Sequence, residues 1–264
     1  MIEDVNGTEL YYERRGSGPT ILFIHGSTLD HRMWAPQLEA LGSYDLITYD
    51  LRGFGRSPPP TGPFKHCEDA LGLLDKLGVE HAVVVGHSIG GLYGLELACI
   101  APERITGFAA LCMSGLGTPQ FPDAIKAVFQ AVHTAARAGN IPEAKRLWLD
   151  TGWFATARAK PELRELIDQM VADYTGWYWL NDSPSQNIVP PVVERLETLK
   201  IPAMVIDGEL DLDYNHQIAQ NLATRIPDAT LVKIAYAGHM ANLEEPAEVN
   251  RALVALARLA HIAG

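Results

Sequence analysis

Short runs of apolar residues alternate along this chain with segments whose apolar residues recur at helical spacing. The predicted strands are 8–14, 20–24, 45–50, 83–85, 105–113, 203–207 and 229–234. The continuous apolar run at 20–24 is of the kind expected in a parallel strand covered on both faces. Helices are predicted at 33–41, 64–77, 92–98, 192–199, 214–225 and 246–261. This alternation predicts an α/β fold whose sheet is parallel over most of its width.

The alternation stops between residues 117 and 191, where only helices are predicted, at 121–138, 142–150 and 161–175. This segment holds four of the five tryptophans, namely Trp148, Trp153, Trp177 and Trp179. A helical insertion after a sheet strand, rich in aromatics, is typical of a cap over a site at the strand ends. The alternative is that the aromatics pack a small core of the insertion itself. We therefore expect a core domain of residues 1–116 and 192–264 and a helical cap subdomain of residues 117–191.

Composition and charge narrow the function classes. A chain of 264 residues can form one large α/β domain with an inserted subdomain. Its 47% hydrophobic and 20% charged residues are ordinary for a globular enzyme, which argues against disorder. The net charge of -11 argues against a nucleic acid or an anionic membrane as partner and leaves a small molecule. The amino terminus lacks the apolar core of a signal peptide and no run is long enough to span a bilayer, so we expect a cytoplasmic protein.

The three cysteines, Cys67, Cys99 and Cys112, are an odd number without close spacing. Such a pattern fits reduced thiols better than a disulfide framework or a zinc site. We accordingly expect no metal and no cofactor.

The most informative stretch is residues 82–92, in which the β-branched run 83–85 stops abruptly at Gly86 and a helix-compatible segment follows without a spacer. Ser88 stands at the apex, with Gly86 two residues before it and Gly90 two residues after it. A sharp strand-to-helix turn requires small residues at those two positions because its backbone crowds them. The alternative is a glycine-rich turn with an incidental serine.

A serine hydroxyl is a poor nucleophile at neutral pH and needs a base within hydrogen-bonding reach, held in turn by an acid. His239 directly follows the last predicted strand, where loops of a parallel sheet gather. The remaining histidines lie in turns, before a strand, or on predicted helices and surface loops (His25, His31, His66, His81, His87, His133, His216 and His261). Asp211 is the favoured acid, in competition with Asp207, Glu209 and Asp213. The chain order serine, acid, histidine is the order associated with α/β hydrolases.

Two further loops carry polar residues. The loop at His25-Gly26-Ser27 leaves a central strand and could aim backbone N–H groups at a neighbouring site, although an ordinary turn has the same appearance. In the loop that begins at residue 50 we interpret Asp50 and Arg52 as a charge pair that braces the loop.

Over essentially its full length the chain resembles α/β-hydrolase-fold enzymes, within which it is most similar to serine carboxylesterases and 3-oxoadipate enol-lactonases. The matching motifs are HGS at 25–27, DLRGFGRS at 50–57, GHSIGG at 86–91, GELD at 208–211 and GHMANLEEP at 238–246. The resemblance implies a mostly parallel eight-stranded sheet flanked by helices. It also implies Ser88 as nucleophile, His239 as base, Asp211 as orienting acid, and the N–H groups of Ser27 and Ile89 as an oxyanion hole. Dehalogenases and epoxide hydrolases of this fold have an aspartate in place of the serine.

The expected function is hydrolysis of carboxylic esters of small to medium size through an acyl-enzyme. Alternatives with the same triad are an enol-lactone hydrolase and a C–C bond hydrolase, although Met240 stands where the latter often have tryptophan. A cofactor-free haloperoxidase and a non-catalytic ligand-binding homologue are further alternatives. Trp148, Trp153, Trp177, Trp179 and Met240 are candidate contacts of a small-molecule ester or lactone. The oligomeric state is left open, a homodimer being one possibility.

Overall fold

A computed structural model describes residues 1–117 and 120–263, and its centre is one sheet of eight strands. The strands are β1 (Ile2–Val5), β2 (Thr8–Arg15), β3 (Thr20–Ile24), β4 (Asp45–Tyr49), β5 (Ala82–His87), β6 (Ile105–Leu111), β7 (Ala203–Gly208) and β8 (Thr230–Ile234). Their order across the sheet is β1-β2-β4-β3-β5-β6-β7-β8. From β4 to β8 all neighbouring strands pair parallel, and β2 and β1 extend the sheet antiparallel. The predicted fold class is therefore confirmed.

The strand β1 was not predicted from the sequence. It is short and lies at the edge of the sheet, and Val5 is its one buried residue. An edge strand that buries so little lacks the apolar run by which the central strands are recognised.

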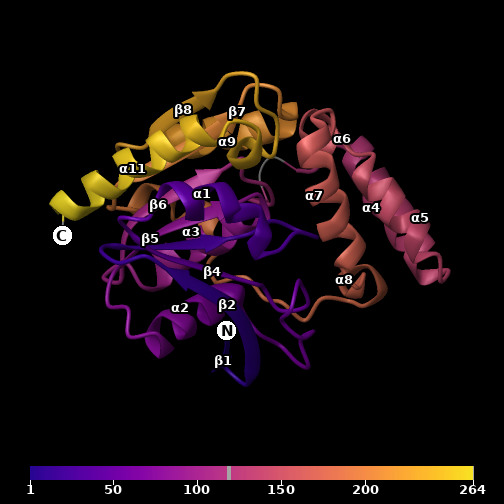
Figure 1. Cartoon of the computed structure of the whole chain (residues 1–264), viewed down its shortest axis with the longest axis horizontal. Helices are drawn as coiled ribbons and strands as arrows, with labels where there is room; N and C mark the ends of the chain where they lie inside the picture. Colours follow the sequence, from indigo (N-terminus) through magenta and orange to yellow (C-terminus); the bar gives the residue numbers. More distant parts are fainter. Residues whose placement is uncertain (118–119, 264) are drawn as a thin grey trace.

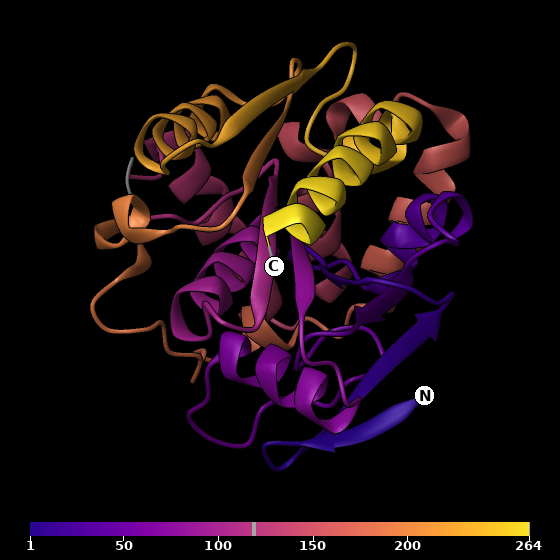
Figure 2. The same cartoon turned by 90° about the vertical axis from the view of Figure 1, so that its left-hand side faces the viewer.

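Helices cover both faces of the sheet (Figure 2), with α1 (Ala35–Ala40) and α11 (Pro246–Ala263) on one side and α2 (His66–Lys76), α3 (Ile89–Ile100) and α9 (Asp213–Arg225) on the other. Successive side chains along β5 point to opposite faces of the sheet, and each face is covered by helices. Val83 lies on the face where Gly107 approaches α11, and Val84 lies on the face against Gly94 of α3. No helix within the described residues is both long and apolar enough to cross a membrane.

Between β6 and β7 the chain forms a group of helices beside the sheet, seen at the right of Figure 1. They are α4 (Asp123–Arg137), α5 (Ile141–Leu149), α6 (Gly152–Arg158), α7 (Pro161–Asp173) and α8 (Trp177–Leu180). We call residues 123–180 the cap helices. The three long helices were predicted, whereas the short α6 and α8 were not; the division into two domains stays a prediction.

The expected helix at 192–199 is wrong. The chain instead forms two single 3₁₀ turns, Val192–Glu194 and Leu196–Thr198. Two prolines precede the first turn and Pro202 follows the second, so the stretch is too short to support a nucleated helix.

The cap helices rest on the core through an aromatic stack. Phe54, in the loop after β4, stacks with both Tyr174 and Tyr178, with ring centroids 5.2 and 5.0 Å apart. The Tyr178 hydroxyl donates a hydrogen bond to the backbone oxygen of Arg52 at 2.9 Å. These contacts hold the segment of the cap around Tyr174 and Tyr178 against the loop after β4.

The interpretation of Asp50 and Arg52 as a pair is wrong. The Arg52 guanidinium binds Asp69 of α2, with 2.7 Å between Nη2 and Oδ1. Asp50 accepts hydrogen bonds from His31 and from the backbone N–H of Arg56 instead. Both charges do brace loops, but each has a partner that sequence proximity did not indicate.

Candidate active site

Ser88 lies at a sharp turn between β5 and α3. Its backbone angles, φ 54° and ψ -123°, are strained for a residue with a side chain. A Cβ atom on Gly86 would lie 2.2 Å from the oxygen of Gly90, and one on Gly90 would lie 2.5 Å from the oxygen of Ile24. The two glycines are thus required sterically, and the turn pushes the Ser88 side chain out at the end of the strand.

The register of the parallel strands gathers the loops around Ser88. Ile24 pairs with Gly86, and His87 pairs with Leu111, so β3, β5 and β6 end side by side. The strands β7 and β8 end at the same edge and lead to the loops that carry Asp211 and His239. Residues distant in the sequence therefore meet at the carboxyl edge of the sheet.

Three of the predicted side chains form one hydrogen-bonded line. Ser88 Oγ lies 3.0 Å from His239 Nε2, and His239 Nδ1 lies 2.8 Å from Asp211 Oδ2. A carboxylate only accepts, so the imidazole proton belongs on Nδ1 and Nε2 is left as the acceptor facing the serine hydroxyl. Asp211 and His239 are both buried, and Asp211 Oδ1 is held by the N–H of Leu212 at 2.7 Å.

The competing carboxylates are occupied elsewhere or face solvent. Asp207 lies 2.9 Å from His216 Nδ1, and Asp213 is exposed at the start of α9. Glu209 is exposed as well. Of the four candidates, the structure brings only Asp211 to His239.

Two neighbours hold the His239 loop from either side. The buried His87 ring donates from Nε2 to the backbone oxygen of His239 at 2.9 Å, and burial keeps the pKa of His87 well below its ordinary value. The carboxylate of Glu244 accepts from the N–H groups of Gly238 at 2.9 Å and Met240 at 3.0 Å. Burial raises the pKa of Glu244 despite these two bonds, which lower it. Sequence reasoning missed Glu244 because its neighbour Glu245 carries the same charge and nothing in the motif distinguishes the two.

The two residues whose backbone N–H groups are predicted to form an oxyanion hole lie in the cavity wall together with Ser88. Ser27 and Ile89 both line the cavity that contains the Ser88 side chain. Ile89 is the first residue of α3, so its N–H has no carbonyl one turn earlier within the helix. A Cβ atom on Gly26 would lie 3.2 Å from the Cβ of Ser88, which shows how closely the loop after β3 approaches.

The cavity over Ser88 has a volume of about 270 Å³ and a mostly apolar wall. Its lining includes two predicted tryptophans of the cap, Trp148 and Trp153, together with Met240. Sequence reasoning missed the further lining side chains, Leu29, Ser114, Phe121, Phe129 and Phe154. Phe121 precedes α4 and Phe129 lies within it. Their eight-residue spacing was a signal in the sequence that both could face the same side.

Trp177 and Trp179 are not among the described residues that line this cavity. Trp177 packs edge-on against Tyr178 with ring centroids 4.8 Å apart, and Trp179 packs edge-on against Tyr174 at 4.9 Å. For these two tryptophans the alternative interpretation holds, in which aromatic residues of the cap pack against one another.

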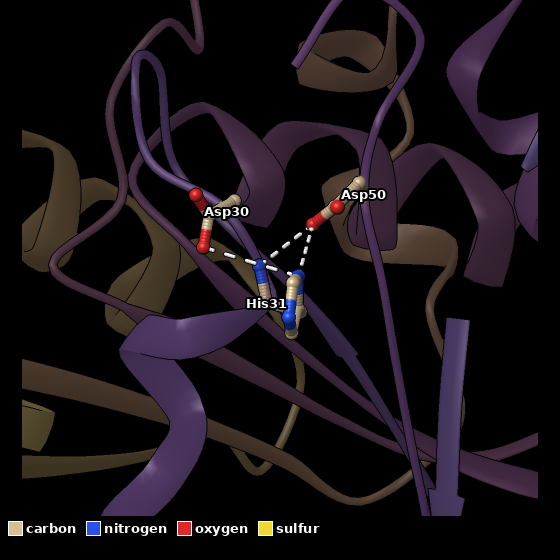
Figure 3. Close-up of side chains that lie close together, drawn as sticks. All are labelled: Asp30, His31 and Asp50. Carbon is tan, nitrogen blue, oxygen red and sulfur yellow. Dashed lines mark hydrogen bonds and ion pairs between the residues drawn. The ribbon is translucent and has the colours of Figure 1, made fainter. Parts of the chain in front are cut away.

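One buried cluster of ionisable side chains lies outside the cavity wall (Figure 3). Ligand atoms of Asp30, His31 and Asp50 fall within 4.8 Å of one another. Asp50 Oδ1 accepts from both the backbone N–H and Nδ1 of His31 at 2.8 Å, and Asp30 pairs with the Arg32 guanidinium at 2.6 Å. Because the protein itself supplies donors to these oxygens, the cluster has the character of a brace between the loops after β3 and β4. His31 is buried here, so its placement on a surface loop was wrong. His66 is buried as well, and it lies in α2, within the helix predicted at 64–77.

Comparisons with known proteins agree with this architecture. A family model described as the alpha/beta hydrolase family matches residues 21–252. RutD of Azorhizobium caulinodans, named as a carbamate hydrolase, is 30% identical, with 93% of this chain and 94% of that protein covered. The enol-lactonase of Burkholderia xenovorans LB400 superimposes with a TM-score of 0.82 at 26% identity, over 97% of this chain and 99% of that one. A thermophilic esterase of Thermogutta terrifontis superimposes with a TM-score of 0.83 at 26% identity, over 99% and 98%.

Proposed function

The chain belongs to the alpha/beta hydrolase family and is a hydrolase, and on this premise we propose that it cleaves carboxylic esters with Ser88 as nucleophile. The observation that carries the proposal is the line Ser88, His239, Asp211, with separations of 3.0 and 2.8 Å, at the floor of a cavity. A nucleophile, a base and an orienting acid within hydrogen-bonding distance are the arrangement that serine hydrolysis requires.

In the first half of the reaction, Ser88 Oγ attacks the acyl carbon and His239 Nε2 takes the hydroxyl proton. The resulting oxyanion lies against the N–H groups of Ser27 and Ile89, which stabilise negative charge that the ground state lacks. Collapse of the intermediate breaks the bond to the alcohol, and the imidazolium returns its proton to the leaving oxygen. Asp211 stabilises the imidazolium and holds the ring in the required tautomer.

In the second half, a water molecule attacks the acyl-enzyme carbon while His239 accepts one of its protons. The second intermediate breaks the bond to Ser88, which recovers its proton from His239, and the acid product leaves. This sequence consumes one water per ester and needs no other co-reactant.

The cavity favours an uncharged substrate. No lysine or arginine is among the described residues that line it. A charged substrate would lose its hydration there without gaining a counter-charge, which is costly in an apolar site. Apolar acyl or alcohol groups match the aromatic wall, and a volume of about 270 Å³ suits small to medium esters.

Lactone hydrolysis is the second candidate, favoured by the similarity to the enol-lactonase of Burkholderia xenovorans. A lactone is a cyclic ester and reacts through the same steps. The uncharged wall favours neutral lactones over enol-lactones that carry a free carboxylate.

The test is hydrolysis of p-nitrophenyl esters and neutral lactones by the wild type and three variants. Ser88→Ala should lose about 10⁶-fold in kcat, because the members of a triad act as a unit. Asp211→Asn should lose roughly 10⁴-fold through the wrong tautomer of the histidine. Asp213→Asn is the matched control and should retain wild-type activity. Turnover by Ser88→Ala above a tenth of wild type, or greater damage from Asp213→Asn, would contradict the proposal.

A further inference from the structure

A chain of buried hydrogen bonds runs from the cap into the wall of the cavity. Trp153 Nε1 donates to Asn215 Oδ1 at 3.0 Å. Asn215 Nδ2 donates both to the backbone oxygen of Met113 at 3.0 Å and to Ser114 Oγ at 2.6 Å. Residues Trp153, Asn215 and Ser114 are 6%, 1% and 6% exposed. Cap, α9 and the end of β6 thus share one polar connection.

The direction of every bond in this chain is fixed by its ends. An indole N–H only donates, so the amide oxygen of Asn215 must face Trp153. A backbone carbonyl only accepts, so the amide nitrogen must face Met113. The same nitrogen then supplies its second hydrogen to Ser114 Oγ, which therefore acts as an acceptor.

The hydroxyl hydrogen of Ser114 consequently has to point elsewhere. Within residues 1–117 and 120–263 no hydrogen bond is found in which Ser114 is the donor. Ser114 lines the same cavity as Ser88. A hydroxyl hydrogen in an apolar wall is unfavourable unless it meets an acceptor, so a ligand oxygen is the partner that this site is suited to bind.

The other polar residues of the cavity wall are Ser27, His87, Ser88 and His239. Ser88 and His239 face one another, Ser27 contributes its backbone, and the His87 ring donates to the His239 backbone. The reaction does not use the side chain of Ser114, and the bond from Asn215 sets the orientation of its hydroxyl group.

We propose that Ser114 determines specificity by donating a hydrogen bond to a second oxygen of the substrate, distinct from the carboxyl group that is cleaved. The inference rests on the proposed ester hydrolysis and names its substrate class: neutral esters or lactones that carry an ether, ketone or amide oxygen in the part facing β6. Trp153 and Asn215 are positioning residues, because they act by turning the Ser114 hydroxyl toward the cavity.

The test compares ester pairs that differ only by an oxygen in place of a carbon. Suitable p-nitrophenyl pairs are methoxyacetate with butanoate, 3-methoxypropanoate with pentanoate, and 4-oxopentanoate with 4-methylpentanoate. For each pair the ratio of kcat/KM values, oxygen ester to carbon ester, is measured for the wild type and for each variant. Dividing by the wild-type ratio removes the intrinsic reactivity that the oxygen confers on the ester.

In Ser114→Ala the ratio should fall by about 5- to 10-fold for at least one pair, which is the worth of one neutral hydrogen bond. The carbon esters should keep kcat/KM within about threefold, since they make no such bond. Ser114→Thr keeps a hydroxyl and should keep the ratio.

Asn215→Asp is a second variant with an independent readout. A carboxylate can still accept from Trp153, but it loses the bond to the backbone oxygen of Met113 and accepts from Ser114 instead of donating to it. The hydroxyl hydrogen of Ser114 then turns away from the cavity. The ratio should therefore fall although Ser114 is intact.

Ratios within twofold of wild type in Ser114→Ala for all three pairs would overturn the inference. Hydrolysis of the carbon esters by the wild type and its loss in Ser88→Ala test the proposed function separately. An enzyme that cleaves the carbon esters but has an unchanged ratio in Ser114→Ala refutes only the inference; one that cleaves none refutes both.

Discussion

The hydroxyl of Thr28 joins the cap to the loop proposed to stabilise the oxyanion, and Thr28→Val should uncouple them. Thr28 Oγ1 accepts from Trp148 Nε1 at 2.6 Å and donates to the backbone oxygen of Ser27 at 2.6 Å. Valine has nearly the same shape, and the positive φ of 62° strains a β-branched residue equally in both proteins. The substitution therefore removes two hydrogen bonds and little else.

The expected cost follows from the burial of the groups left behind. Trp148 is buried, so its indole N–H stays unpaired at about 1–3 kcal/mol, and the lost bond to Ser27 adds about 1 kcal/mol. We expect the free energy of unfolding to fall by about 2–4 kcal/mol. Because the loop carrying Ser27 is loosened, kcat should fall roughly tenfold with a smaller change in KM.

The assay is urea denaturation followed by tryptophan fluorescence, combined with ester hydrolysis. In the Trp148→Phe background there is no indole N–H to leave unpaired, so Thr28→Val should then cost only about 1 kcal/mol. The matched control is Thr151→Val: the buried Thr151 Oγ1 has no partner among the described residues, so its removal breaks no hydrogen bond and should not lower the free energy of unfolding. Equal effects of Thr28→Val in both backgrounds would refute the reasoning.

Three further predictions concern the loop of the base, a buried carboxyl and the size of the cavity. Glu244→Gln replaces an acceptor of two backbone N–H groups by an amide that accepts one. Urea denaturation should show that the free energy of unfolding falls by about 2–3 kcal/mol, and kcat should fall at least tenfold. Glu245→Gln, at a partly exposed neighbour, should change neither quantity, and equal effects of the two substitutions would contradict the role assigned to Glu244. Burial raises the pKa of Glu96 from 4.5 to about 7, so the folded state holds this proton more tightly and stability falls as pH rises between those values. Glu96→Gln should therefore exceed wild type in stability by up to ~3 kcal/mol at pH 8 and lose that advantage near pH 4.5, and an advantage independent of pH would refute the assignment. Phe129→Ala enlarges the cavity, so kcat/KM for p-nitrophenyl octanoate relative to butanoate should rise about tenfold; an unchanged chain-length profile would remove Phe129 from the substrate wall.

The sequence indicated the central strands and the Ser88 turn because both depend on local chemistry. The apolar run at 83–85, two spaced glycines and the apex serine require a strand, a turn and a helix whatever surrounds them. The order of Ser88, Asp211 and His239 along the chain followed from the same motifs, and their separations agree with it.

Hydrogen-bond and ion-pair partners that come from loops distant in the sequence could not be predicted in this way. Arg52 binds Asp69 rather than Asp50 because α2 packs under its loop, which local sequence does not encode. Glu244 and Glu245 are adjacent carboxylates, and only the fold of the short α10 (Ala241–Glu244) turns the first toward the His239 backbone. The cap tryptophans divide for the same reason, two toward the cavity and two toward the cap interior.

The most direct test of the central claim is to trap the nucleophile with a fluorophosphonate ester and locate the adduct by peptide mass spectrometry. We predict one adduct, on Ser88, formed at a rate roughly 10³- to 10⁴-fold lower in Asp211→Asn, because the base is then held in the wrong tautomer. Ser88→Ala should remain unlabelled while keeping the wild-type urea denaturation profile. Labelling at another residue, or undiminished labelling of Ser88→Ala, would contradict the account.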